Sequence, residues 1–94
     1  MNQRLQKNAV SDSALAQLRV PPHSIEAEQS VLGGLLLDNQ AWDRMGDLVT
    51  DGDFYRDEHR RIFRQIRNLL ERSRPADVVT VAEALEGAGE GEQT

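Results

Sequence analysis

The chain has 94 residues, no cysteine and a formal net charge of −5, and about a quarter of its residues are leucine, isoleucine, valine or phenylalanine. This composition predicts one small domain held together by packing, because disulfides, cysteine-ligated zinc and cysteine nucleophiles are excluded. The longest apolar run, residues 31–37, is far shorter than the ~20 residues that span a bilayer, and no secretion signal opens the chain. We therefore expect no membrane association and a cytoplasmic location.

The first part of the chain is expected to be flexible. Residues 1–19 are rich in glutamine, asparagine, serine and alanine and contain no turn signal, so we interpret them as a disordered tail. Val20-Pro21-Pro22 then favours an extended backbone, because each proline restricts itself and the residue before it. Ser24 is a suitable N-cap for a first helix, with Glu26 and Glu28 in its first turn, where acidic side chains are favoured.

An amphipathic helix of about fourteen residues is predicted after this cap. Ile25, Leu32 and Leu36 fall at i, i+7 and i+11, which predicts a stripe that faces the core. Gly33 and Gly34 interrupt the helix interior, where each glycine costs about 1 kcal/mol relative to alanine. We expect a second helix to pack closely over these glycines and offset the cost, with helix pairing between two chains as the alternative.

A second, shorter helix is predicted after Asp38 and Asn39, which are suitable caps, and it is expected to end near residues 50–52. Its broad apolar side consists of Ala41, Trp42, Met45, Leu48 and Val49. We interpret Trp42 as a core anchor, with an anchor for a partner protein as the alternative.

The strongest helical pattern in the chain begins just after two aromatic residues, Phe54 and Tyr55, and is expected to end before Pro75. Phe54 is assigned to the core. The apolar residues that recur at helical spacing, and so predict a continuous core stripe, are Ile62, Phe63, Ile66, Leu69 and Leu70.

A short fourth helix is predicted to reach about Glu86, because Thr80 and Glu83 have the spacing of a capping box. Three glycines then alternate with other residues, which predicts a flexible C-terminus over residues 90–94. No segment shows the alternation of a strand. The predicted fold is therefore all-α, a small orthogonal bundle of about four helices over residues 20–89.

No catalytic, cofactor or metal site can be assigned from the residues. His23 and His59 lie 36 positions apart, without the further ligands that a metal site needs. No phosphate-binding loop of the GxxxxGK[S/T] or GxGxxG type occurs. We therefore expect the chain on its own to be neither an enzyme nor a nucleotide-binding protein.

A local excess of positive charge stands out in this acidic chain. Residues 56–74 carry seven arginines against three carboxylates. Arg60, Arg64 and Arg67 fall at i, i+4 and i+7, which places them in one exposed row on the helix. Guanidinium groups suit phosphates and carboxylates, so the row is a candidate contact for a polyanion or an acidic partner.

The alternative for this row is an ordinary solvated face. Asp57 can pair with Arg60 or Arg61, and Glu71 can pair with Arg67, at helical spacing. No aromatic or glycine-rich element accompanies the row in the sequence, and the net charge of −5 weakens affinity for nucleic acid. We favour this alternative.

A longer segment carries a family resemblance. Residues 20–38, VPPHSIEAEQSVLGGLLLD, closely resemble the opening of the N-terminal domain of bacterial replicative DNA helicases of the DnaB type. The similarity continues in order through Asp53-Phe54-Tyr55, His59-Arg60, Ile62-Phe63 and the segment PADVVTVAEAL at residues 75–85. It covers about residues 20–89 and is far more specific than a short motif.

The resemblance implies an all-helical head that assembles through a helical hairpin into a ring collar and docks primase. It also implies a linker to a RecA-like ATPase that translocates on single-stranded DNA, with ATP and Mg²⁺ bound there. We expect the hairpin, the linker and the ATPase to lie outside this chain, which stops at Thr94. The implied partners are other helicase subunits, primase and a helicase loader; the candidate interface residues are Glu26, Trp42, Arg60, Arg64 and Arg67.

Three functions remain open at this point. We favour a piece of a replicative helicase, whose function is fork unwinding and primosome organisation. The second is a stand-alone interaction module that binds or competes for helicase, loader or primase. The third is a small nucleic-acid-binding protein that uses the arginine row. Self-association of the chain is a further expectation, because missing family helices would leave apolar surface exposed.

Overall fold

The computed structural model describes residues 10–18 and 23–93, with side chains described as far as residue 88. The described residues form helices and no strand, which confirms the predicted all-α fold. None of these helices is long and apolar enough to cross a membrane. The elements are α2 (Asp12–Gln17), α3 (Ile25–Leu37), α4 (Ala41–Met45), the 3₁₀ turn η1 (Asp51–Asp53), α5 (Asp57–Glu71) and α6 (Val78–Gln93).

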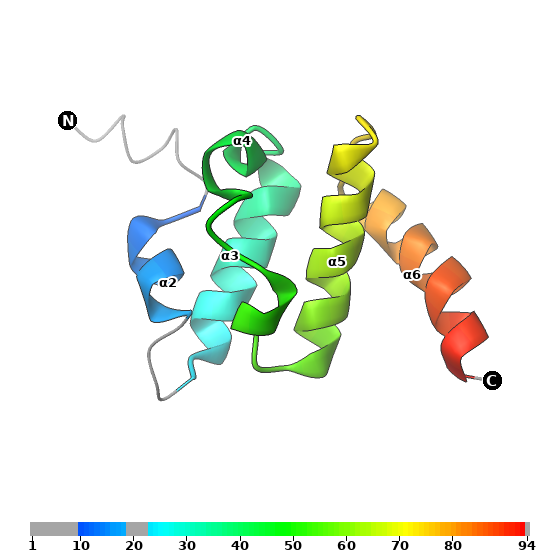
Figure 1. Ribbon diagram of the computed structural model, residues 1–94, viewed down its shortest axis with the longest axis horizontal. Coiled ribbons are helices and arrows are strands. Elements are labelled where there is room, and N and C mark those ends of the chain that lie inside the picture. Colours follow the sequence, from blue (N-terminus) through cyan, green and yellow to red (C-terminus); the bar gives the residue numbers. More distant parts are fainter. Residues whose placement is uncertain (1–9, 19–22, 94) are drawn as a thin grey trace.

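The two central helices, α3 and α5, lie side by side and run in the same direction rather than crossing at right angles (Figure 1). Helix α2 packs on α3, and α6 packs on α5 at the other end of the molecule. Helix α4 and turn η1 lie in the connection that returns from the end of α3 to the start of α5 (Figure 1). The core therefore lies around the contact between α3 and α5.

Helix α3 begins as predicted, because the Ser24 hydroxyl accepts a hydrogen bond of 3.1 Å from the Ala27 amide. Its buried face is shifted from the predicted stripe. Val31 and Leu35 are fully buried, whereas Ile25 and Leu36 are only half-buried. The face is shifted and wide because α2 and α5 both pack against this helix.

The predicted close packing over the glycine pair is only partly seen. Gly34 is buried in α3. A Cβ atom at Gly33 would meet no atom within 4 Å, so no helix of the described residues covers that position. The expected compensation for Gly33 is thus wrong for this chain by itself.

Helix α5 carries the predicted core stripe. Phe63, Ile66 and Leu69 are buried, and the predicted neighbours Ile62 and Leu70 pack on the core while partly exposed. Phe54 is 1% exposed, and its ring centroid lies 5.1 Å from that of Phe63. An aromatic cluster therefore fills the space between α5 and the connection that precedes it.

Part of the expected N-terminal tail is folded. Ser11 caps α2 by accepting a hydrogen bond of 3.0 Å from Ala14, and Val10, Ala14 and Leu18 are buried. These three residues recur every four positions, so they form one helical face against α3. Residues 10–18, which were expected to be disordered, are thus folded against a surface that α3 supplies. Residues 1–9 lie outside the described part.

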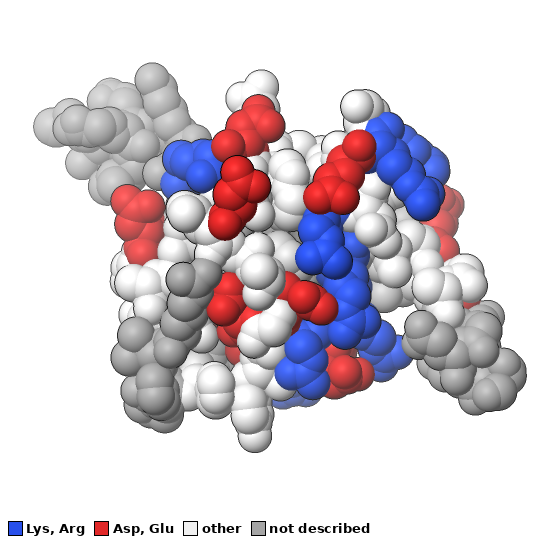
Figure 2. Space-filling model, viewed as in Figure 1, with Lys and Arg blue, Asp and Glu red and all other residues white. Residues whose placement is uncertain are grey.

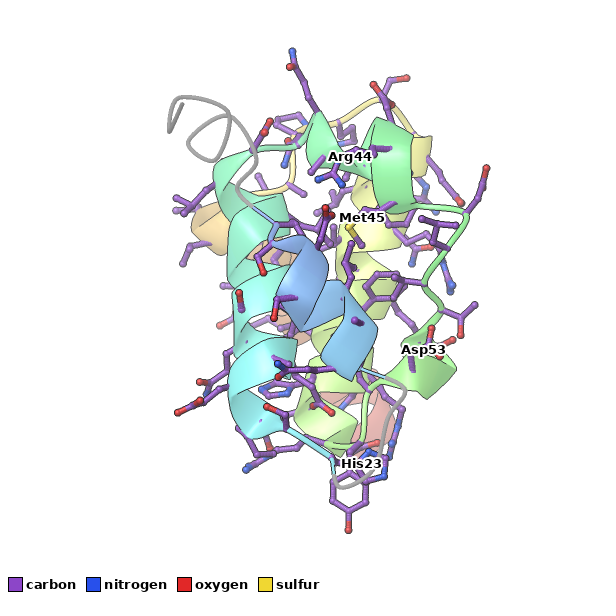
Figure 3. All side chains as sticks on the ribbon, turned by 90° about the vertical axis from the view of Figure 1, so that its left-hand side faces the viewer. His23, Arg44, Met45 and Asp53 are labelled. Carbon is purple, nitrogen blue, oxygen red and sulfur yellow. The ribbon has the colours of Figure 1, made fainter. Side chains whose placement is uncertain are left out.

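Helix α4 strengthens this contact from the other side. The Arg44 guanidinium donates a hydrogen bond of 3.4 Å to the Val10 carbonyl and lies 3.7 Å from the Asp12 carboxylate (Figure 3). Met45, the next residue, is fully buried and points into the interior. α4 is therefore shorter than predicted, but it holds α2 in place.

Asn39 does not cap α4. Its side-chain amide donates hydrogen bonds of 2.9 Å to the carbonyls of Leu35 and Ala76, and its oxygen accepts one of 3.1 Å from the Ala76 amide. Asp38 supplies the local bond instead, by accepting from the Gln40 amide at 3.1 Å. Asn39 thus joins the end of α3 to the link between α5 and α6.

The end of α5 and the start of α6 differ from the predictions by a few residues. Ser73 has φ 59, and the amides of Ser73 and Arg74 donate to Leu70 and Leu69, which closes α5 after Glu71. Asp77 and Thr80 form the reciprocal capping pair of α6, with bonds of 2.8 and 2.9 Å.

Helix α6 continues past the predicted end. It runs from Val78 to Gln93 and so includes residues 90–93 of the terminus that was expected to be flexible. Thr94 lies outside the described part. The three glycines lower helix propensity without removing any backbone hydrogen-bonding group, so they weaken the helix rather than end it.

Substitution of Phe63 by alanine tests this core. Phe63 is fully buried against Phe54 and Trp42, so the variant should lose about 3–5 kcal/mol of unfolding free energy. Urea unfolding followed by circular dichroism measures the loss. Leu37→Ala is the control, because Leu37 is 86% exposed. Equal stability of the two variants would contradict the assignment of the core.

Candidate interaction site

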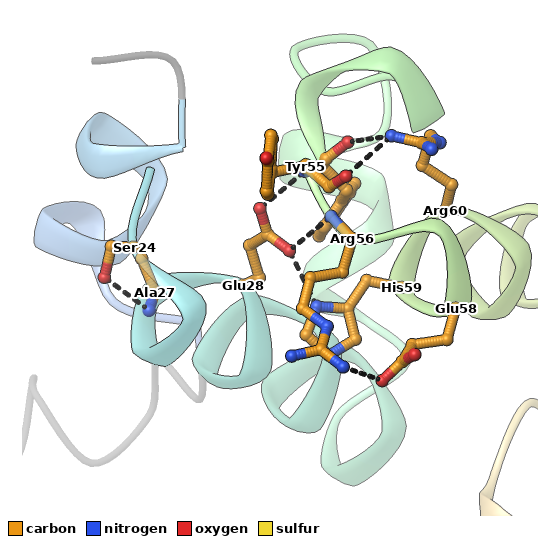
Figure 4. Close-up of polar contacts among 9 residues, drawn as sticks. Ser24, Ala27, Glu28, Tyr55, Arg56, Glu58, His59 and Arg60 are labelled. Atoms are coloured by element: carbon orange, nitrogen blue, oxygen red, sulfur yellow. Dashed lines mark hydrogen bonds and ion pairs between the residues drawn. The ribbon is translucent and has the colours of Figure 1, made fainter. Parts of the chain in front are cut away.

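A buried carboxylate joins α3 to the start of α5. Glu28 is 1% exposed, and its oxygens accept a hydrogen bond of 2.7 Å from His59 Nδ1 and one of 2.6 Å from the Tyr55 amide (Figure 4). The Arg56 amide lies 3.4 Å from the same carboxylate. Arg56 is the N-cap of α5 and has no side-chain cap of its own. Glu28, which lies on another helix, therefore binds the N-cap amide of α5 and the amide just before it.

The ionisation of Glu28 follows from these contacts. Burial opposes the charged form, but the hydrogen bonds from His59 and from the Tyr55 and Arg56 amides outweigh it, so the pKa of Glu28 lies below its usual value. The carboxylate is therefore charged at neutral pH and accepts all of these bonds.

A second residue fixes the same segment from the outside. Arg60 Nη1 donates hydrogen bonds of 3.0 and 2.8 Å to the carbonyls of Phe54 and Tyr55. The backbone at residues 54–56 is thus held by Glu28 and by Arg60 (Figure 4). The Tyr55 side chain is 60% exposed and stacks on His23, with ring centroids 4.3 Å apart. An exposed aromatic pair is presented on a fixed backbone.

Arginine side chains continue from this pair along α5, where they form a band (Figure 2). Asp57 lies 3.4 Å from Arg60 and 3.2 Å from Arg61, as the spacing predicted. Arg64 Nε donates a hydrogen bond of 2.9 Å to Asp51 in η1. Arg67 was predicted to pair with Glu71, but it lies 4.0 Å from the Asp51 carboxylate instead.

Asp51 is held charged by these arginines. The hydrogen bond from Arg64, opposed by partial burial, and the charges of Arg64 and Arg67 place the pKa of Asp51 below its usual value. The arginine row therefore ties η1 to α5, in addition to facing solvent.

The predicted interface residues do not all lie together. Arg60, Arg64 and Arg67 fall at i, i+4 and i+7 of α5 and therefore share one face of this helix. Glu26 is exposed in the first turn of α3, and Trp42 is half-buried against the core, with its ring 5.7 Å from Phe63. Trp42 thus packs on the core in this structure.

Sequence reasoning missed the residues that organise the site. Tyr55 was seen only as an aromatic residue before a helix, and Glu28 only as an acid in the first turn of α3. Glu28 and His59 are 31 positions apart, so no local pattern marks them as partners. His23 was weighed only as a metal ligand, and the described residues contain no group of three His, Cys, Asp or Glu that could hold a metal ion.

Comparison with known proteins places these features in a family. The protein-family model described as "DnaB-like helicase N terminal domain" matches residues 20–94. The chain belongs to this family. The replicative DNA helicase DnaB of Buchnera aphidicola subsp. Schizaphis graminum is 49% identical over 73 residues, which cover 78% of this chain and 16% of that protein. The recognition of the family from residues 20–38 and the segments that follow is confirmed.

Two other DnaB proteins show the same coverage pattern. That of Haemophilus influenzae is 46% identical over 79 residues, covering 84% of this chain and 17% of the relative. That of Rhodothermus marinus is 45% identical over 75 residues, covering 80% of this chain and 8% of the relative. The chain thus spans less than a fifth of each of these relatives, and its matched part contains Glu28 and the α5 arginines.

The free energy of unfolding should fall on acidification. Because Glu28 and Asp51 have lowered pKa values in the folded chain, the unfolded chain takes up protons first as pH falls. The stability they contribute is complete above the ordinary carboxyl pKa of about 4 and is lost as pH drops through the folded-state values. Urea unfolding between pH ~7 and ~3 measures this loss.

Glu28→Gln should remove part of this dependence. At neutral pH it should cost about 2–4 kcal/mol, because the amide group replaces a charged acceptor among three donors. Glu26→Gln is the matched control, since Glu26 is exposed two residues away. An unchanged stability and an unchanged acid slope in Glu28→Gln would show that this carboxylate does not hold the two helices together.

Proposed function

We propose that this chain is the N-terminal interaction and assembly domain of a replicative DNA helicase, with a role in fork unwinding and primosome organisation. The observation that carries the proposal is the match of residues 20–94 to the helicase N-terminal domain model. The relatives are named replicative DNA helicases, and they extend far beyond the part that this chain matches.

The proposed partners are proteins of the replication machinery, in the cytoplasm: other helicase subunits, primase and a helicase loader. ATP, Mg²⁺ and the translocating contact with DNA are assigned to the remainder of such a helicase. The fixed backbone and the exposed side chain of Tyr55 support the interaction role, because tyrosine and arginine are frequent among residues that dominate binding energy.

A chimeric helicase tests the proposal. Residues 20–94 of this chain replace the matching segment of the Haemophilus influenzae helicase, and native mass spectrometry and ATP-dependent strand separation are measured. We expect the oligomeric state of that helicase and an unwinding rate within about threefold of it. A chimera that carries Phe63→Ala is the control, because it shows the result expected when the exchanged domain does not fold. A folded chimera that neither assembles nor unwinds would contradict the proposal.

A further inference from the structure

The arginine band on α5 is not neutralised by its own neighbours. Five arginines lie along it, whereas the carboxylates paired with them are those of Asp51, Asp57 and Glu58. The band consists of Arg56, Arg60, Arg61, Arg64 and Arg67. A local positive excess therefore remains on a chain whose net charge is −5.

These arginines retain free donors although their positions are fixed. Arg64 uses Nε for Asp51, and its terminal nitrogens have no partner among the described residues. Its side chain is 41% exposed. Arg67 lies over the Phe63 ring, 5.9 Å from the centroid, and reaches Asp51 only at 4.0 Å. A carboxylate from outside can thus use the terminal fork of Arg64 without breaking its bond to Asp51.

The Tyr55–His23 pair extends the band at the N-terminal end of α5. Arg60 connects the two features, because it bonds to the Tyr55 carbonyl and stands first in the row with Arg64 and Arg67. Glu28 holds the Tyr55 amide from the inside. Since hydrogen bonds already hold this backbone and the Arg64 side chain, binding here loses less conformational entropy than binding to a free segment would.

We propose that the arginine band and the Tyr55–His23 pair form one docking surface for an acidic protein segment that carries an aromatic or large apolar residue. The carboxylates of the segment contact Arg64 and Arg67, and its apolar residue packs on the exposed ring of Tyr55. This inference rests on the proposed function, because it assigns a surface and a partner chemistry to the interaction role.

A protein segment fits this surface better than a nucleic acid does. Asp51, Asp57 and Glu58 interleave with the arginines, so a continuous phosphate backbone would meet repulsion along the band. A peptide can place its carboxylates at intervals that avoid these acids. The net charge of −5 also opposes the approach of a long polyanion.

Binding of synthetic probes to the 94-residue chain tests the surface. The probe is a fluorescein-labelled peptide of alternating glutamate and serine with one central phenylalanine, and its anisotropy is measured at ~50 and ~300 mM salt. The matched peptides replace every glutamate by glutamine, or the phenylalanine by alanine. A labelled oligothymidylate is the nucleic-acid probe. We expect the acidic aromatic peptide to bind about tenfold more tightly than either matched peptide and than oligothymidylate.

Variants locate the binding on the chain. Arg64→Gln with Arg67→Gln should weaken the peptide about tenfold, and Tyr55→Ala should weaken it about threefold. Arg72→Gln with Arg74→Gln removes the same charge beyond the end of α5 and should change affinity less than about twofold. Circular dichroism melts of each variant separate loss of binding from loss of folding.

Four results would overturn the proposal: no peptide binding by folded chain, equal binding of the glutamine peptide, tighter binding of oligothymidylate, or equal weakening by the two double variants. The chimeric helicase distinguishes failure of the proposed docking surface from failure of the proposed function. If the chimera assembles and unwinds while the peptide does not bind, only the docking surface is wrong. If the peptide binds as expected and the chimera fails, the assembly role is wrong.

Discussion

The hydrogen bonds of the buried Glu28 carboxylate are the constraint on which the arrangement of α3 and α5 depends. Burial of a carboxylate costs several kcal/mol unless its oxygens are bonded, and here His59 and two backbone amides of the next helix supply the donors. The same contact supplies an acceptor for the Tyr55 amide and for the amide of Arg56, the N-cap residue of α5. Both elements would otherwise carry an unpaired polar group, so the contact fixes which end of α5 lies beside the first turns of α3.

The hydrogen bonds of Glu28 also hold the backbone that carries the exposed side chains near the start of α5. The Glu28 carboxylate accepts hydrogen bonds from the backbone amides of Tyr55 and Arg56, and the side chains of both residues are exposed. Arg60 closes the outer side of the same segment, and Asp51 ties η1 to the next two arginines of the row. The stability of the domain and the position of its exposed side chains thus depend on one network of hydrogen bonds and ion pairs.

The elements that sequence reasoning predicted correctly are those that local patterns determine. The Ser24 cap and the stripe from Phe63 to Leu69 need only residues within a few turns of each other. Contacts between distant residues could not be predicted: Asn39 bonds to Ala76 across 37 positions, and α2 is buried only because α3 offers it a surface. The start of α6 was misplaced because Asp77 and Thr80 form a capping pair just ahead of the Thr80–Glu83 pair that the sequence favoured.

Amide hydrogen exchange at Tyr55 tests the central claim most directly, because that amide lies outside the helical hydrogen-bond ladder and depends on Glu28 alone. In the native chain we expect it to exchange at least about a hundredfold more slowly than an unprotected amide, and to lose most of this protection in Glu28→Gln while the central amides of α5 keep theirs. Exchange of the Tyr55 amide at the unprotected rate in the native chain, with α5 intact, would contradict the account.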